Sequence, residues 1–179
     1  MGAIKTYMGH WFDPMEPKSD AIDIRDIAHA LSLTCRGNGH VKTFFSVGQH
    51  CIHCALEAEA RGYSKKIILA CLLHDATEAY LSDVPRPFKQ ALPQYREAED
   101  ALLDIICNKY LGERLKEEEI EIVKQIDDDM LYYDMLALFD MQVQEVAPEI
   151  KISISFEVMP FETIEQTYLT LYYKWKNES

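Results

Sequence analysis

The sequence is poor in positive charge. It carries 18 Lys and Arg residues against 30 Asp and Glu residues, which gives a formal charge of −12 at neutral pH. A dense basic face, which proteins use to bind a nucleic-acid polymer or an anionic membrane, is therefore not expected. The 179 residues include only 7 glycines and 7 prolines, and 48% are hydrophobic, which excludes disordered and fibrous classes. Residues 1–179 are expected to form one globular domain.

The sequence also lacks a long hydrophobic run. Residues 1–20 contain several charged side chains and no apolar core of the kind that marks a secretory leader. The longest uninterrupted apolar run covers residues 67–73, far short of the ~20 residues that a membrane-spanning helix needs. We therefore expect a cytoplasmic protein that does not bind membranes.

Cysteines are few, and their number is odd. Cys51 and Cys54 form a CxxC pair, which admits a zinc or a redox interpretation. A structural zinc site usually has a second ligand pair at similar spacing, and a thioredoxin-like pair follows a strand, whereas this pair lies in a helical pattern. Buried, reduced thiols are the favoured interpretation for all five cysteines, which are Cys35, Cys51, Cys54, Cys71 and Cys107.

Helical periodicity dominates the chain and predicts an all-α fold with about six main helices. Asp23, Ser46 and Ser64 stand where N-capping residues are expected. Residues 151–158 alternate between apolar and polar side chains, which fits either a short strand or an extended loop. The core of the domain is expected over residues 23–146. The predicted helices cover approximately residues 24–35, 47–61, 65–80, 94–110, 116–146 and 161–176.

Several ionisable residues interrupt the apolar helices. His74 and Asp75 directly follow the apolar run 67–73, where ionisable groups are costly unless they are paired or bound to a metal. His50 lies on the preceding predicted helix, and the short connection at Gly62 makes the two helices antiparallel neighbours. Each residue taken alone is more often a hydrogen-bonded core residue. Two imidazoles with carboxylates, taken together, suit a first-row divalent metal.

The sequence around these residues is more specific than the residues taken alone. Residues 45–50 read FSVGQH, and residues 72–89 read LLHDATEAYLSDVPRPFK. The order His50, then His74 and Asp75, then an Asp on a later helix resembles the H…HD…D signature of HD-domain metal-dependent phosphohydrolases. Both stretches are similar to the bacterial 5′-deoxynucleotidase branch and its phage-associated relatives. The resemblance runs from about residue 23 to residue 134 and implies a helical bundle of the HD-domain type.

The resemblance implies one divalent metal ion, which can be Mn, Co, Fe, Zn, Ni or Mg. Its ligands would be His50, His74, Asp75 and an Asp early in a long helix. The spacing of the family pattern favours Asp127 for this last position, with an acid seven residues later. Asp128 and Asp129 remain alternatives, and since they point ~100° and ~200° away around the helix, only one of the three can face the metal well.

The same resemblance implies catalytic roles for Glu78 and Asp83. The residue before Asp83 is Ser82, where the branch usually has glycine. The branch also uses an arginine about fourteen residues before the first histidine to hold phosphate, and Arg36 is the nearest match. The residues expected to bind substrate and its phosphate are Arg36, His40 and Lys89, with Arg86 as a further candidate.

The expected function is hydrolysis of (deoxy)nucleoside 5′-monophosphates to nucleoside and phosphate, by attack of a metal-activated water. One alternative keeps the site but hydrolyses dNTPs and releases tripolyphosphate. Another is a non-catalytic nucleotide sensor, which would not need both Glu78 and Asp83. The expected partner is a small nucleotide and not a nucleic-acid polymer. The aromatic residues between Tyr168 and Trp175 fit either core packing or the seam of a homodimer.

Overall fold

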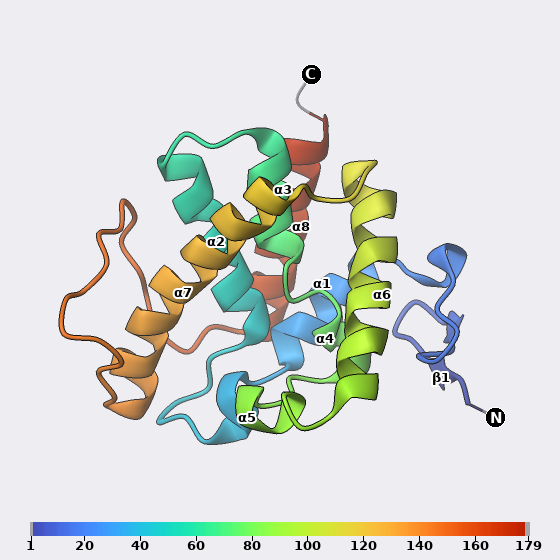
Figure 1. Cartoon of the computed structure of the whole chain (residues 1–179), viewed down its shortest axis with the longest axis horizontal. Coiled ribbons are helices and arrows are strands. Elements are labelled where there is room, and N and C mark those ends of the chain that lie inside the picture. The colour runs from blue at the N-terminus through green and yellow to red at the C-terminus, as the bar shows by residue number, and fades with distance from the viewer. Residues whose placement is uncertain (1, 178–179) are drawn as a thin grey trace.

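A computed structural model describes residues 2–177. Within this part of the chain, six helices have nine residues or more, and the only sheet is a two-stranded hairpin, so the predicted all-α class is confirmed (Figure 1). The long helices are α1 (Ile24–Leu33), α2 (Val47–Ala60), α3 (Lys65–Leu73), α6 (Pro93–Leu111), α7 (Glu117–Phe139) and α8 (Phe161–Asn177). The shorter elements are β1 (Ile4–Lys5), β2 (Trp11–Phe12), η1 (Ser19–Ala21), η2 (Arg36–Gly39), α4 (Glu78–Leu81) and α5 (Arg86–Lys89).

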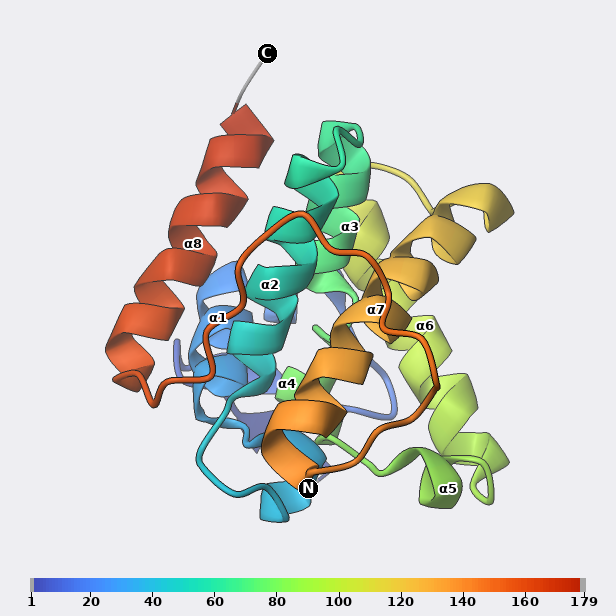
Figure 2. The ribbon, with the colours of Figure 1, turned by 90° about the vertical axis from the view of Figure 1, so that its left-hand side faces the viewer.

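The antiparallel pair α2 and α3 lies at the centre of the bundle. Helices α1 and α8 pack on one side of this pair, and α6 and α7 pack on the other (Figure 2). All residues from Ile67 to Leu73 are buried. The longest apolar run of the sequence is therefore the most enclosed helix, because neighbours cover it on every side.

The predicted helix starts are confirmed by their caps. The Asp23 side chain accepts a hydrogen bond from the backbone N–H of Arg25, and Ser64 accepts one from Ile67. Ser46 and Gln49 form a complete capping box at the start of α2. Each cap satisfies backbone donors that the first turn of a helix leaves free.

The prediction of one helix over residues 65–80 is wrong, because α3 ends at Leu73. In a continuing helix, the carbonyls of Cys71 and Leu72 would accept from the next turn. Instead, His74 Nδ1 donates to the Cys71 carbonyl at 2.7 Å, and the Tyr168 hydroxyl donates to the Leu72 carbonyl at 2.6 Å. The backbone then forms a tighter turn, in which Ala76 N–H bonds to the Leu73 carbonyl, before α4 begins.

The prediction of a helix over residues 116–146 is also too long, because α7 ends at Phe139. Asp140 takes a left-handed conformation with φ of 55°, and both its N–H and that of Met141 bond back to the Met135 carbonyl. Lys42 N–H satisfies another terminal carbonyl, that of Leu138. Residues 140–160 contain no regular secondary structure, so of the two interpretations of residues 151–158 the extended loop is confirmed and the strand is wrong.

This long loop crosses the outer faces of α2 and α7 (Figure 2). The buried carboxylate of Glu57 on α2 holds it by accepting hydrogen bonds from the backbone N–H groups of Lys151 and Ile152 at 2.9–3.1 Å. Arg61 donates to the same carboxylate at 2.7 Å and to Asp129 of α7 at 2.8 Å. One buried acid therefore ties two helices and the loop together.

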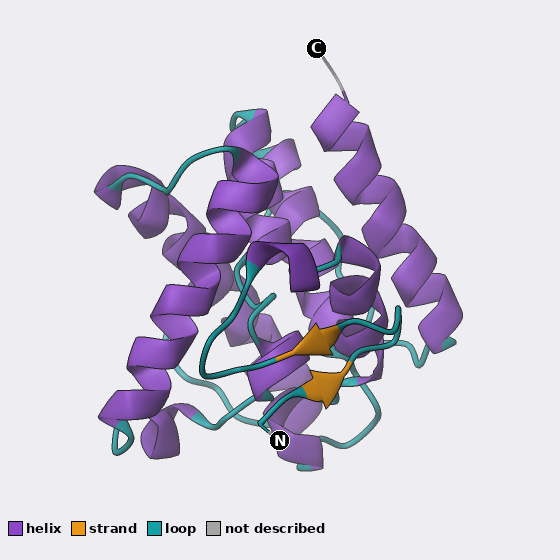
Figure 3. Ribbon diagram, turned by 90° about the vertical axis from the view of Figure 1, so that its right-hand side faces the viewer, coloured by secondary structure: helices purple, strands orange, loops and turns teal. Residues whose placement is uncertain are grey.

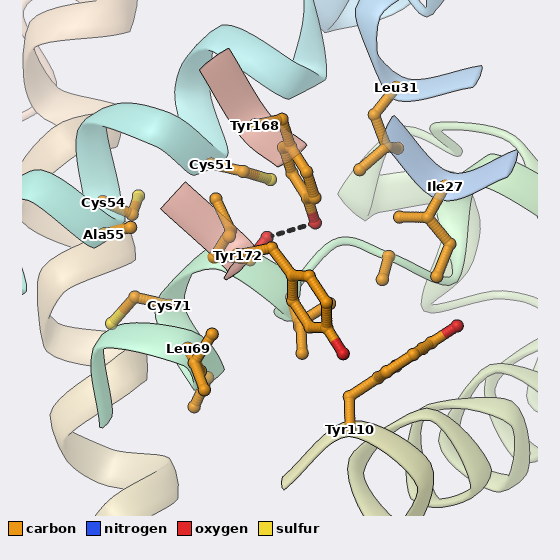
Figure 4. Packing of buried hydrophobic residues seen from close by; sticks show 14 of the residues in the cluster. Ile27, Leu31, Cys51, Cys54, Ala55, Leu69, Cys71, Tyr110, Tyr168 and Tyr172 are labelled. Carbon is orange, nitrogen blue, oxygen red and sulfur yellow. Dashed lines mark hydrogen bonds between the residues drawn. The ribbon is translucent and has the colours of Figure 1, made fainter. Parts of the chain in front are cut away.

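The predicted last helix is confirmed as α8, and one side of it enters the core. Ile164, Tyr168, Leu171 and Tyr172 are buried, whereas Tyr173 is exposed. Figure 4 shows Tyr168 among the central side chains, with its hydroxyl bonded to the α3 backbone. Core packing therefore accounts for these buried aromatics, and the homodimer remains a prediction.

Residues 2–20 precede the first long helix. They contain the small hairpin β1–β2, drawn as two arrows in Figure 3. The hairpin contacts α1 through Tyr7 and His29 and contacts α4 through Phe12 and Tyr80. Trp11 is exposed, but Phe12 is fully buried and stacks at 4.2 Å, centroid to centroid, on Tyr80 of α4. Among the described residues, no helix has the length and apolar character needed to span a membrane.

Candidate metal centre and adjoining pocket

The four residues predicted as metal ligands lie together, although they come from three segments. His50 projects from α2, His74 and Asp75 stand in the turn after α3, and Asp127 projects from α7. Asp127 Oδ1 lies 3.0 Å from His50 Nε2 and 3.7 Å from His74 Nε2. Asp75 Oδ2 lies 3.3 Å from His74 Nε2. The contact of α7 with both α2 and α3 brings these side chains to one point.

The second nitrogen of each imidazole is held in place. His50 Nδ1 bonds to Asp134 Oδ2 at 2.8 Å, and His74 Nδ1 bonds to the Cys71 carbonyl at 2.7 Å. Metal-binding histidines usually have such a partner, which fixes the ring and leaves the other nitrogen for the cation. His74 Nε2 is buried without a hydrogen-bond partner. The residues present therefore fit a cation bound between the two Nε2 atoms and the two carboxylates.

The electrostatics of the centre favour added positive charge. Burial acts to lower the pKa of His74, but Asp75 and Asp127 outweigh it and raise that pKa well above its ordinary value. Burial acts to raise the pKa of Asp127, but the hydrogen bond with His50 and the charge of the nearby His74 hold that pKa well below the usual range. Two ionised carboxylates thus draw protons onto the imidazoles, and a divalent cation would release those protons when it binds.

The structure separates the three consecutive acids of α7. Asp127 faces the imidazoles, whereas Asp128 forms an ion pair with Lys124 on the outer side of the helix. Asp129 is buried but accepts hydrogen bonds from Arg61 and from Gln125 of its own helix. The preference for Asp127 therefore agrees with where these side chains lie.

A pocket of about 430 Å³ opens beside the centre. One wall is apolar and comes mainly from the last turns of α7, with Leu131, Met135, Leu138 and Phe139. The rest of the lining is mostly polar and includes most of the residues predicted to bind substrate or act in catalysis. The charged residues that line the pocket are Arg36, Asp75, Glu78, Asp83, Lys89, Asp127 and Asp134.

Arg36 reaches the pocket from a tight turn. Gly37 has φ of 57°, and a Cβ placed there would lie 2.4 Å from the ring of Phe139, so both the backbone conformation and the space favour glycine. The turn directs the Arg36 guanidinium between Asp75 and Asp134, at 3.3 Å from each. These carboxylates raise the pKa of Arg36 in spite of its burial.

Glu78 and Asp83 both line the pocket, but their surroundings differ. Glu78 is only 7% exposed, and its Oε2 has no hydrogen-bond partner. Burial, together with the charges of Asp75 and Asp83, raises the pKa of Glu78 well above its ordinary value. Asp83 accepts a hydrogen bond from the Gly37 N–H at 3.2 Å, which fixes the carboxylate.

The three remaining candidates for substrate binding differ in where they lie relative to the pocket. Lys89 lines the pocket, but its ammonium group is paired with Glu99 at 2.6 Å. His40 is exposed and does not line the pocket, so the structure does not bring it to the centre. The Arg86 side chain lies outside the described part of the structure.

Sequence reasoning missed two neighbours of His50. Asp134 was noted as an acid seven residues after Asp127, but not as the hydrogen-bond partner of His50. The signal was present, because seven residues return nearly to the same helix face. The second neighbour is Cys54, whose sulfur lies 3.5 Å from His50 Nε2 and which follows His50 by four residues, again on the same face.

Two curated proteins are similar to this chain. The uncharacterized protein YfdR of Escherichia coli K12 is 39% identical over 110 residues, which cover 62% of this chain and 59% of that protein. An uncharacterized protein of Rhodobacter capsulatus is 37% identical over 99 residues, which cover 52% of this chain and 50% of that protein. The chain therefore spans about half to three-fifths of these relatives, and their descriptions name no activity. No family model matches the chain.

Proposed function

We propose that this protein is a metal-dependent phosphohydrolase that converts (deoxy)nucleoside 5′-monophosphates to nucleoside and phosphate. One divalent cation would be held by His50, His74, Asp75 and Asp127. The observation that carries the proposal is the pair of imidazoles, the buried His50 and the largely buried His74, each fixed through Nδ1 and each directing Nε2 toward a carboxylate. The resemblance of the same residues to the HD-domain signature supports this assignment.

The donor set bears on the identity of the cation. Imidazole nitrogen suits Mn, Fe, Co, Ni and Zn, whereas Mg²⁺ prefers sites made of oxygen. A cation of the first group would polarise phosphoryl oxygens and lower the pKa of a nearby water. The other parts of the proposed reaction fall to residues of the chain itself.

Arg36 is suited to hold the phosphate. Its guanidinium is already fixed by Asp75 and Asp134, so little conformational entropy remains to be lost when an anion binds. Two of its five N–H donors are used in these contacts, which leaves others for phosphate oxygens. The charge of Arg36 and that of the cation would offset the local carboxylates, although the whole chain carries −12.

Glu78 is suited to handle the proton that hydrolysis requires. Departure of the nucleoside as an alcohol needs a proton on its 5′ oxygen, and the buried Glu78 carboxyl has an oxygen with no partner in the protein. Asp83, anchored by the Gly37 N–H, can accept a hydrogen bond from the attacking water and orient it. Glu78 would thus give its proton to the leaving 5′ oxygen, and Asp83 would take up the proton that the attacking water loses.

The apolar wall suits the nucleoside part of the substrate. A volume of about 430 Å³ lies in the range of small-molecule sites, and the wall of Leu131, Met135, Leu138 and Phe139 offers contact for a base and a sugar. A site for inorganic phosphate alone would not need such a wall. The pocket therefore supports a nucleotide over a simple phosphate ester.

The proposal is tested with purified protein, a panel of nucleoside mono-, di- and triphosphates, and Mn²⁺, Co²⁺ or Mg²⁺, with identification of the products. Inorganic phosphate from monophosphates supports the proposal, and tripolyphosphate from dNTPs would replace it by the triphosphohydrolase alternative. His74→Ala and Asp75→Ala should lose both bound metal and activity, whereas Glu78→Gln should keep the metal and lose the rate. Asp128→Asn, on the outer side of α7, is the matched control. If metal is bound but no nucleotide is hydrolysed under any condition, the sensor interpretation holds instead.

A further inference from the structure

A thiol lies inside the candidate metal centre. Cys54 is 1% exposed, and its sulfur is 3.5 Å from His50 Nε2, the imidazole nitrogen that faces Asp127. The Cys54 sulfur and one ring nitrogen each of His50 and His74 all lie within 4.8 Å of one another. Of the two ring nitrogens of His74, Nε2 has no hydrogen-bond partner. The H…HD…D pattern does not include this sulfur.

Most buried cysteines act as small hydrophobic residues, and the neighbouring Cys51 shows the contrast. Cys51 also lies near His74 and Asp75, but Figure 4 shows its sulfur turned toward Tyr168 in the aromatic core. Cys54 follows His50 by four residues on α2, and residues at this spacing lie on the same face of a helix. Cys54 therefore shares the side of α2 from which His50 reaches the metal centre.

The separation of sulfur and nitrogen matches that of two ligands of one cation. Zinc lies about 2.3 Å from a thiolate sulfur and about 2.0–2.1 Å from an imidazole nitrogen, and a tetrahedral angle between these bonds places the two donors about 3.5 Å apart. The measured distance between Cys54 Sγ and His50 Nε2 is 3.5 Å. No rearrangement of α2 is needed for both atoms to bind the same ion.

We propose that Cys54 is a sulfur ligand of the centre and that it gives the site a preference for thiophilic divalent cations, with Zn²⁺ as the main one. The inference rests on the metal centre of the proposed function and adds which cation that centre selects. On binding, the Cys54 thiol releases its proton to solvent and its sulfur bonds to the cation, with no change of oxidation state. Harder cations such as Mn²⁺ gain little from sulfur, so they would bind through the imidazoles and carboxylates.

The first experiment is titration of Co²⁺ into the metal-free full chain, kept reduced with a phosphine. A sulfur-to-cobalt charge-transfer band in the near ultraviolet is expected in the wild type and in Cys107→Ser, whose cysteine lies on α6. The band should also persist in Cys51→Ser and be lost in Cys54→Ser. Absence of the band in the wild type, or its loss in Cys51→Ser with retention in Cys54→Ser, would overturn the proposal. Absence of the band in the wild type refutes the proposal even where a variant fails to fold, and retention of the band in Cys54→Ser refutes it whatever the other variants show.

The second experiment measures affinities by competition with chelators. Cys54→Ser should weaken Zn²⁺ binding by about 10-fold or more and leave Mn²⁺ binding unchanged within about twofold. Cys54→Ala, with folding checked by circular dichroism, should behave in the same way. An equal loss for both cations would mean that Cys54 only supports the packing of α2, and the proposal would fail. If the protein shows the cobalt band but hydrolyses no nucleotide, this inference stands and the proposed hydrolase activity is refuted. If it hydrolyses nucleotides but shows no band, the hydrolase proposal stands and this inference is refuted.

Discussion

Replacing Asp134 by Asn perturbs the candidate metal centre without replacing a predicted ligand. Asp134 is 3% exposed, accepts a hydrogen bond from His50 Nδ1 at 2.8 Å and pairs with Arg36 at 3.3 Å. Although burial acts to raise its pKa, His50 and Arg36 hold the pKa of this carboxyl below its usual value, so it is ionised at neutral pH. Asn keeps the size and one oxygen acceptor but removes the charge that fixes the imidazole and makes it a better donor to a cation.

The expected loss follows from the position of Asp134 behind a ligand. Removing such a partner typically weakens metal binding by about 10- to 100-fold, which corresponds to about 1.4–2.7 kcal/mol. The loss should lie in this range and should not reach abolition, because His74, Asp75 and Asp127 keep their positions. Direct removal of a ligand, as in His74→Ala, should cost more.

The assay is competition for Co²⁺ or Zn²⁺ between the protein and a chelator of known affinity, at neutral pH. Asp128→Asn is the matched control, because it makes the same chemical change on the same helix at a residue paired with Lys124 on the outer side. Its affinity should equal that of the wild type. An Asp134→Asn affinity within twofold of the control would refute the view that Asp134 orients His50 for metal binding.

Three further substitutions test the packing around the centre by urea unfolding in a chelator, which removes metal binding from the comparison. Glu57→Ala should cost about 1–3 kcal/mol, because it leaves two backbone N–H groups of the loop and one N–H of Arg61 without their acceptor, although Arg61 stays paired with Asp129. Glu59→Ala, at a surface ion pair, should cost less than about 1 kcal/mol, and equal costs would contradict the role given to Glu57. Tyr168→Phe should cost about 1–2 kcal/mol through the lost bond to the α3 backbone, and an unchanged stability would show that this bond is dispensable. Burial lowers the pKa of His53 from 6.5 to about 4, so the unfolded chain binds more protons than the folded chain between these pH values. The free energy of unfolding therefore decreases as the pH falls from 6.5 to about 4. His53→Phe should remove up to about 3 kcal/mol of that loss between pH 7 and pH 4, and parallel pH profiles of the two proteins would refute the assignment.

The capping residues and the candidate site were accessible from the sequence because both are written in local patterns. Asp23, Ser46 and Ser64 sit directly before apolar periodic segments, and each caps the helix predicted from it. The candidate ligands occur along the chain in the order of the H…HD…D motif. Their meeting in space needed only that neighbouring helices pack against one another.

The helix ends were harder, because contacts distant in sequence decide them. The apolar pattern of α3 continues to Tyr80, yet the Tyr168 hydroxyl, almost a hundred residues later, takes a carbonyl that a longer helix would need. The end of α7 depends in the same way on Lys42, which donates to the Leu138 carbonyl. His40 illustrates the opposite error: it was expected to bind substrate, but it follows the turn at Gly37 and is exposed.

The pairing of α1 with α8 has a consequence for biosynthesis. These two helices lie side by side although they stand near opposite ends of the described chain (Figure 2). On the ribosome, α1, α2 and α3 emerge well before α8, so the nascent chain exposes their apolar faces until the last helix arrives. Since Tyr168 of α8 helps to end α3 ahead of His74, the turn that carries His74 and Asp75 takes its final shape late. The proposed metal site should therefore reach its final geometry only after α8 has left the ribosome and packed against α3.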